Sequence, residues 1–143
     1  MINLQNLKNK FLIDEDAELE NIEHLIDRFS EFVKVDLGGH VVFKDKNLRS
    51  NLTIPEKILV VIAARFLASK LQEKLKGEVT ISPTVDAGEI TKFINVQKTV
   101  VAARLKELKD ERKILSPRTG VFSIAPYNID SIIIRLEEKN KEK

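Results

Sequence analysis

Residues 89–114 read EITKFINVQKTVVAARLKELKDERKI, and the apolar spacing in this stretch predicts two short helices joined by a tight turn. The first helix ends near residue 94. Asn95 then supplies the left-handed backbone conformation that a tight turn requires. The second helix is expected over residues 98–112. The apolar positions that the two helices would bury are Ile90, Phe93, Val101, Leu105 and Leu108.

The residues before this stretch contain two capping signals. Residues 86–89 pair an Asp with a Glu three positions later, which is a capping box at the start of the first helix. Residues 53–56 form a second capping box, which opens a helix that runs to about residue 74. Because that helix is apolar almost all round, we expect other elements to surround it. Between the two boxes, residues 79–81 predict a short strand.

The residues after this stretch predict a hairpin and a final helix. Two runs of strand-forming residues, 114–115 and 121–124, flank the turn residues 117–120. Asn128 can then cap a closing helix whose apolar residues lie within 129–136.

The first fifty residues predict a separate region. Residues 19–33 have the apolar spacing of an amphipathic helix, and the period then changes to the alternation of a strand. The Gly38-Gly39 pair precedes a second run of strand residues, 41–43, and indicates a hairpin. Residues 44–52 are polar and rich in turn-forming residues, which is typical of a linker. We therefore expect residues 1–50 to form a helical and hairpin region, and residues 51–143 a second domain.

The order of helix, strand, helix, tight turn, helix and hairpin over about residues 54–126 resembles the winged helix-turn-helix superfamily. The resemblance rests on the apolar positions of 89–114, on the turn residue Asn95 and on Val96 after it. It implies an α+β fold: a winged-helix domain with an N-terminal helical and hairpin extension and a C-terminal helix. The abundance of Lys, Glu and Ile without Cys is also typical of thermophilic archaeal proteins, so the expectation is a small archaeal-type DNA-binding protein.

Membership of this superfamily implies that the chain binds duplex DNA as a transcriptional regulator, through the second helix of the motif and the wing. Lysines there would contact phosphates, and the first polar residues of the helix would touch base edges. The candidate DNA-binding residues are Gln97, Lys98, Thr99, Lys106, Lys109 and Arg118.

Two other classes of function compete with this interpretation. The same helix exposes small apolar residues, Val100, Ala102 and Ala103, and has no Arg or Asn in its first two turns. Those features favour a protein-protein interaction module within a larger assembly. An enzyme is the weakest hypothesis, because the sequence contains no nucleophile triad, no carboxylate pair in an apolar setting and no glycine-rich phosphate loop. We expect no catalytic residue and no cofactor.

Composition limits the remaining possibilities. The formal net charge is only +2, yet residues 14–31 hold eight acids against one base, and residues 92–118 hold eight bases against three acids. The absence of Cys excludes disulfides and thiolate metal sites, and two histidines in unrelated contexts argue against a histidine-rich metal centre. The longest apolar run, residues 58–64, is far below the ~20 residues of a membrane span. These features predict a cytoplasmic protein with no membrane contact.

An expectation about assembly follows from the apolar helices. The segments 19–33 and 129–136 have wider apolar faces than a winged domain of this size needs for its own core. Proteins of the superfamily commonly bind two DNA half-sites as dimers. We therefore expect a homodimer formed through one or both of these helices.

Overall fold

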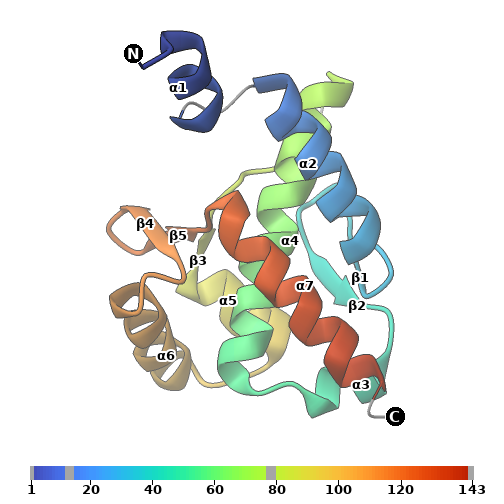
Figure 1. The fold of residues 1–143 in the computed structure, drawn as a ribbon. Coiled ribbons are helices and arrows are strands. Elements are labelled where there is room, and N and C mark those ends of the chain that lie inside the picture. The colour runs from blue at the N-terminus through green and yellow to red at the C-terminus, as the bar shows by residue number, and fades with distance from the viewer. Residues whose placement is uncertain (1, 12–14, 77–79, 142–143) are drawn as a thin grey trace.

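Helix α4 (Ile54–Leu75) is the centre of the fold. The computed structural model describes residues 2–11, 15–76 and 80–141, and the other long helices lie around α4 (Figure 1). The expected capping box is present, because the Thr53 hydroxyl accepts the Glu56 N–H and the Glu56 carboxylate accepts the Thr53 N–H. Residues 60–67 are all buried, so the helix has neighbours on every side, as its sequence predicts.

The elements before α4 form two helices, a hairpin and a short third helix. Strands β1 (Val33–Val35) and β2 (Val41–Phe43) pair antiparallel, with Val33 opposite Phe43 and Val35 opposite Val41. Gly39 has a positive φ of 85° in the turn between them, which confirms the predicted hairpin. In chain order these elements are α1 (Leu4–Phe11), α2 (Glu15–Phe29), β1 (Val33–Val35), β2 (Val41–Phe43) and α3 (Lys46–Asn51).

The linker predicted at residues 44–52 is wrong, because this segment contains helix α3. The Asp45 carboxylate accepts the N–H groups of Asn47 and Leu48 and so caps the helix. Leu48 and Leu52 are buried in the main core, which a solvated linker would not allow. The division between residues 50 and 51 therefore falls at the end of α3, and it stays a prediction.

The elements after α4 combine two helices with a small sheet. Its strands lie in the order β3 (Val85–Asp86), β5 (Val121–Ser123) and β4 (Leu115–Arg118), and both pairings are antiparallel. The strand predicted at residues 79–81 is wrong: Thr80 and Ile81 are in no strand, and Val79 lies outside the described residues. In chain order the elements are β3 (Val85–Asp86), α5 (Ala87–Ile94), α6 (Lys98–Asp110), β4 (Leu115–Arg118), β5 (Val121–Ser123) and α7 (Pro126–Lys141).

Helices α5 and α6 follow the local signals of their sequence. The Asp86–Glu89 capping box forms at the start of α5, and Asn95 ends that helix in the left-handed conformation with φ 56°. Arg112 is also left-handed, with φ 62°. The N–H of Arg112 donates to the Lys109 carbonyl, and the N–H of Lys113 donates to the Leu108 carbonyl. This pair of hydrogen bonds is a Schellman motif, in which the left-handed position usually holds Gly.

One continuous core joins both halves of the chain. It includes Ile22 and Phe29 of α2, the buried residues of α4, and Ile133 and Leu136 of α7. Helices α2 and α7 pack on α4 and on each other. The apolar faces that suggested a homodimer are thus covered within one chain, and the structure removes the basis for that prediction.

The fold class predicted from the sequence is wrong. Seven helices account for most of the described residues, and no described strand exceeds four residues. The molecule is a largely helical protein with two small sheets, rather than an α+β winged helix-turn-helix domain with extensions. The physical reason is that the quoted positions of residues 89–114 report only how two short helices pack across a tight turn. Such packing positions recur in unrelated folds.

Candidate interaction surfaces

The residues predicted to contact DNA divide into two groups in the structure. Gln97 is the N-cap of α6 and makes no capping hydrogen bond with its side chain, and Lys98 and Thr99 are exposed in the first turn. Lys106 and Lys109 lie in the last turns of α6. Together with Arg118 at the end of β4, these two lysines line a hollow of about 480 Å³ between α6 and the β4–β5 hairpin. The structure brings the second group together and leaves the first group outside the hollow.

This hollow carries an excess of positive charge. Within the described residues, no ion pair involves Lys106, Lys109 or Arg118. Two nearby acids have other partners. The Glu107 carboxylate accepts from Arg104 Nη1 at 2.8 Å, and Glu111 lies 3.0 Å from Lys113 Nζ. The three cationic side chains are therefore available to an acidic ligand.

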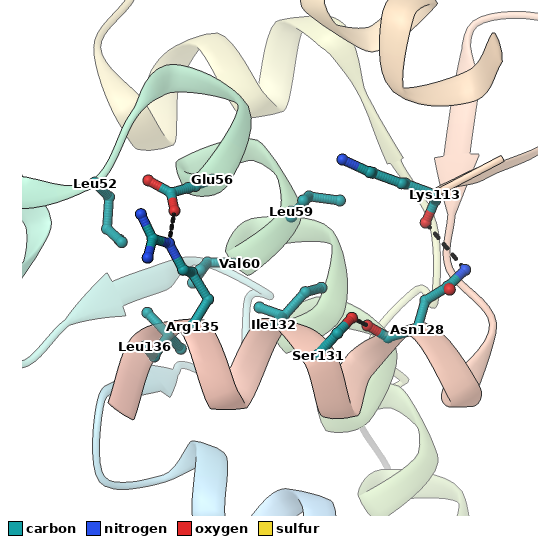
Figure 2. Close-up of a pocket in the computed structure, with 10 residues that line it drawn as sticks. All are labelled: Leu52, Glu56, Leu59, Val60, Lys113, Asn128, Ser131, Ile132, Arg135 and Leu136. Atoms are coloured by element: carbon teal, nitrogen blue, oxygen red, sulfur yellow. Dashed lines mark hydrogen bonds and ion pairs between the residues drawn. The ribbon is translucent and has the colours of Figure 1, made fainter. Parts of the chain in front are cut away.

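A second hollow, of about 440 Å³, lies between the start of α4 and α7 (Figure 2). Ile132 and Leu136 from α7 line it on one side, and Leu59 and Val60 from α4 line it on the other. Leu52, at the end of α3, completes its apolar wall. An apolar groove of this kind suits the side chains of a protein partner better than a charged ligand.

A polar rim holds this α4–α7 groove in shape. Arg135 Nε donates to Glu56 Oε2 at 2.6 Å, which ties α7 to the start of α4 (Figure 2). Burial alone would raise the pKa of Glu56, but hydrogen bonds from the Thr53 N–H and from Arg135 outweigh it and leave that pKa below its ordinary value. At the other end, Asn128 Nδ2 donates to the Lys113 carbonyl at 3.3 Å.

Helix α1 and the residues just before it carry the most exposed apolar side chains near the N-terminus. Ile2 is 74% exposed and Leu4 is 80% exposed, and Leu7 lies one turn further along the helix and is also exposed. Figure 1 shows α1 apart from the helices that enclose the core. An isolated helix of eight residues is marginal in water, so this segment has apolar surface for a contact outside the described fold.

The buried Arg65 is a feature that the sequence does not reveal. Its guanidinium donates to the Gly39 carbonyl at 2.9 Å, to the Thr84 carbonyl at 3.2 Å and to Glu89 Oε2 at 2.6 Å. A Cβ on Gly39 would lie 3.0 Å from this guanidinium, so the hairpin turn needs glycine for space as well as for its positive φ. In the sequence, Arg65 merely ends an apolar run. Arg65 and Gly39 are structural residues that join the hairpin to α4 and α5.

Two further predictions from the sequence are that the chain has no metal centre and no membrane span. Among the described residues there is no cluster of three or more His, Asp or Glu that could hold a metal ion. None of the described helices is both long and apolar enough to cross a bilayer. The acidic segment 14–31 supplies α2, but Asp14 lies outside the described residues.

Comparison with known proteins identifies a family. The family model described as phage gp6-like head-tail connector protein matches residues 1–104, which run from α1 into α6 and make up more than half of the chain. No curated protein and no solved structure gives a significant match.

This match corrects the sequence-based interpretation. The assignment to the winged helix-turn-helix superfamily as an archaeal-type DNA-binding protein is wrong, because the matching family is one of head-tail connectors. The predicted role as a transcriptional regulator and the predicted partner, double-stranded DNA, are wrong for the same reason. The second function weighed from the sequence, a protein-protein module within a larger assembly, agrees better with the family.

Proposed function

Because this chain belongs to the phage gp6-like head-tail connector family, we propose that it is a structural protein that joins partner proteins where the head of a phage meets the tail. The observation that carries the proposal is the family match over residues 1–104. The protein would act as a component of the phage particle, by binding and without catalysis. Its partners would be other proteins of that particle.

The surface chemistry of the described residues supports a binding role. The α4–α7 groove offers an apolar wall with a polar rim, which is the anatomy of many protein interfaces. Four of its ten lining residues, which lie between Leu52 and Val60, come from within the matched residues. The exposed apolar residues of α1 lie within them as well.

Deleting the coding sequence from the phage that carries it tests this proposal. We expect electron microscopy to show filled heads and free tails in place of joined particles, and expression of the wild-type chain in trans to restore joining. Fully joined particles in the deletion strain would overturn the proposed function.

A pair of variants on α7 tests whether the groove makes the contact. Ser131 lies at the groove (Figure 2), so Ser131→Trp would fill it, whereas Asn140→Trp places the same side chain on the same helix outside it. We expect the Asn140 variant to restore joining and the Ser131 variant to fail. If both restore joining, the α4–α7 groove is not the contact surface.

A further inference from the structure

The hollow between α6 and the β4–β5 hairpin contains the strongest chemical signal that the proposed function does not use. Lys106 and Lys109 are one turn apart on α6, and Arg118 approaches from the hairpin. All three side chains are exposed, and none has an ion-pair partner within the described part of the chain. Like charges brought together without neutralisation raise one another's energy, and a ligand of opposite charge removes that cost.

The hairpin side of the hollow is held in a fixed shape by its own hydrogen bonds. Ser116 Oγ lies 2.8 Å from the Arg118 carbonyl and 3.0 Å from the Val121 carbonyl, so it joins the two strands across the turn. The strand backbone that carries Arg118 is therefore ordered before any ligand arrives. A pre-ordered site loses less conformational entropy on binding.

The remaining lining of the hollow is mixed, with the hydroxyl groups of Ser116 and Thr119 beside three apolar residues. Ala102 lies on α6 between the lysines and the helix start, and Pro117 and Phe122 come from the hairpin. Phe122 is half-buried and packs against the main core. A ligand for this hollow therefore needs negative charge opposite the three cations and aliphatic groups opposite the apolar lining.

We propose that this hollow, which we call the basic socket, binds an acidic segment of a partner protein in the assembly. The proposal rests on the proposed function, because it names the chemistry of one partner of a connector. Glu and Asp side chains carry both a carboxylate and methylene groups, which match the cations and the apolar part of the socket lining, and the carboxylate can also accept from the Thr119 hydroxyl. Lys106, Lys109 and Arg118 follow the family-matched residues 1–104, so the family does not assign this site.

The test uses a fluorescently labelled peptide of alternating Glu and Leu, and its binding to the full chain is followed by fluorescence anisotropy. We expect binding at low salt that weakens by about tenfold or more when the Debye length shortens from ~14 Å to ~6 Å. Lys106→Glu with Lys109→Glu should weaken binding at least about tenfold. The matched control is Lys46→Glu with Lys92→Glu, two exposed lysines outside the socket, and it should stay within about twofold.

A neutral pair of variants separates the socket from a diffuse basic surface. Ala102 lines the socket and the adjacent, exposed Ala103 does not. Ala102→Trp fills the hollow without changing any charge and should weaken the peptide about as much as the double lysine variant, whereas Ala103→Trp should leave binding unchanged. Circular dichroism melts of every variant confirm that each one is folded.

Each result decides for or against the socket. Absence of peptide binding, or equal losses with Ala102→Trp and Ala103→Trp, overturns the proposal. A labelled DNA duplex that binds more tightly than the peptide, and whose binding is lost with the same variants, would assign the socket to nucleic acid and overturn the proposal as well.

The socket and the proposed function can fail separately. If the coding-sequence deletion still yields joined particles while the peptide binds, the proposed function fails and the socket stands. If the deletion separates heads from tails while the peptide does not bind, the proposed function stands and the socket fails.

Discussion

Arg65 is a cation inside the apolar centre of α4, and every nitrogen of its guanidinium has an acceptor. Only 4% of the residue is exposed. Its three acceptors come from the β1–β2 turn, from the residue before β3 and from α5, and its guanidinium also lies 5.7 Å from the centre of the Phe93 ring. A buried arginine with an acceptor at each nitrogen fixes how elements from distant parts of the chain meet.

Arg65→Met should therefore destabilise the protein by about 2–4 kcal/mol, because the buried Gly39 carbonyl and the part-buried Thr84 carbonyl lose the guanidinium donor. Glu89 adds less to this cost, since its side chain is 39% exposed and recovers water. Guanidinium denaturation measures the change in the free energy of unfolding. Arg118→Met removes an exposed arginine and should change that free energy by less than about 0.5 kcal/mol. Equal effects of the two substitutions would contradict the structural role of Arg65.

The Glu56 carboxylate makes the free energy of unfolding depend on pH in the acid range. Burial raises its pKa, but hydrogen bonds from Thr53 and Arg135 outweigh burial, so the folded pKa lies below the ordinary value of 4.5. A carboxylate with a lowered pKa stabilises the fold above its unfolded pKa, and this contribution is lost as the pH falls through the folded pKa.

We expect Glu56→Gln to lower the Tm at pH 7, and the gap between variant and wild type to narrow as the pH falls below about 4.5. Thermal melts across this pH range measure the difference in Tm between the variant and the wild type. Glu138 also pairs with Arg135 but is 57% exposed, so Glu138→Gln is the matched control and should produce little pH-dependent difference. A gap that stays constant down to pH ~2 would exclude the Glu56 carboxylate as its source.

At the scale of a single element, the C-terminal end of α6 has a residue with a side chain at the one position where the backbone favours glycine. Arg112 is the left-handed residue of the Schellman motif, where a side chain strains the backbone and Gly does not. No described ion pair involves Arg112, so the substitution removes no such contact.

Arg112→Gly should stabilise the protein by roughly 0.5–1 kcal/mol, because relief of the strain exceeds the extra flexibility that Gly gives the unfolded chain. A rise in Tm measures this effect. Ala103→Gly, at an exposed position in the interior of the same helix, should instead lower stability by about 1 kcal/mol, because Gly weakens a helix interior. A fall in Tm with Arg112→Gly would show that the left-handed backbone is not strained there.

At the scale of the whole molecule, the two predicted regions share one core. The buried side chains of α2, of the hairpin and of α3 pack with those of α4 and α7. A chain that begins at Asn51 would therefore expose the face of α4 that these elements cover.

We expect the chain from Asn51 to lose the cooperative thermal transition of the full protein, as followed by circular dichroism. A chain that lacks only residues 1–11 should keep its Tm, because the exposed apolar residues of α1 contribute little to the core. A sharp transition in the Asn51 chain would show that residues 51–143 fold as a domain of their own.

Local signals in the sequence predict local structure well. The residues at 53–56 and 86–89 form capping boxes because each box needs only four consecutive residues. Gly39 and Asn95 mark their turns because backbone conformation depends on the residue itself. Helix α3 is missed because the burial of Leu48 depends on α7 and the rest of the core, which the local sequence does not contain.

The sites depend on contacts between distant residues, and the sequence predicts them poorly. Lys106 and Lys109 could be paired by helical spacing, but their meeting with Arg118 depends on where the hairpin packs. The α4–α7 groove joins distant residues, such as Glu56 and Arg135, which are 79 positions apart. The packing pattern of residues 89–114 suggested a superfamily because many folds share it, and that is why the sequence-based function is wrong.

The central position of α4 also determines when the protein can fold on the ribosome. Synthesis releases α2 and the β1–β2 hairpin first, and their buried residues Leu25, Phe29 and Val33 then lack the α4 surface that covers them. The nascent chain therefore stays uncompacted and open to chaperones until α4 has left the exit tunnel. Helix α7, with Ile133 and Leu136, is made after α4 and then covers a further part of the same core. Compaction of this core thus waits for the synthesis of α4.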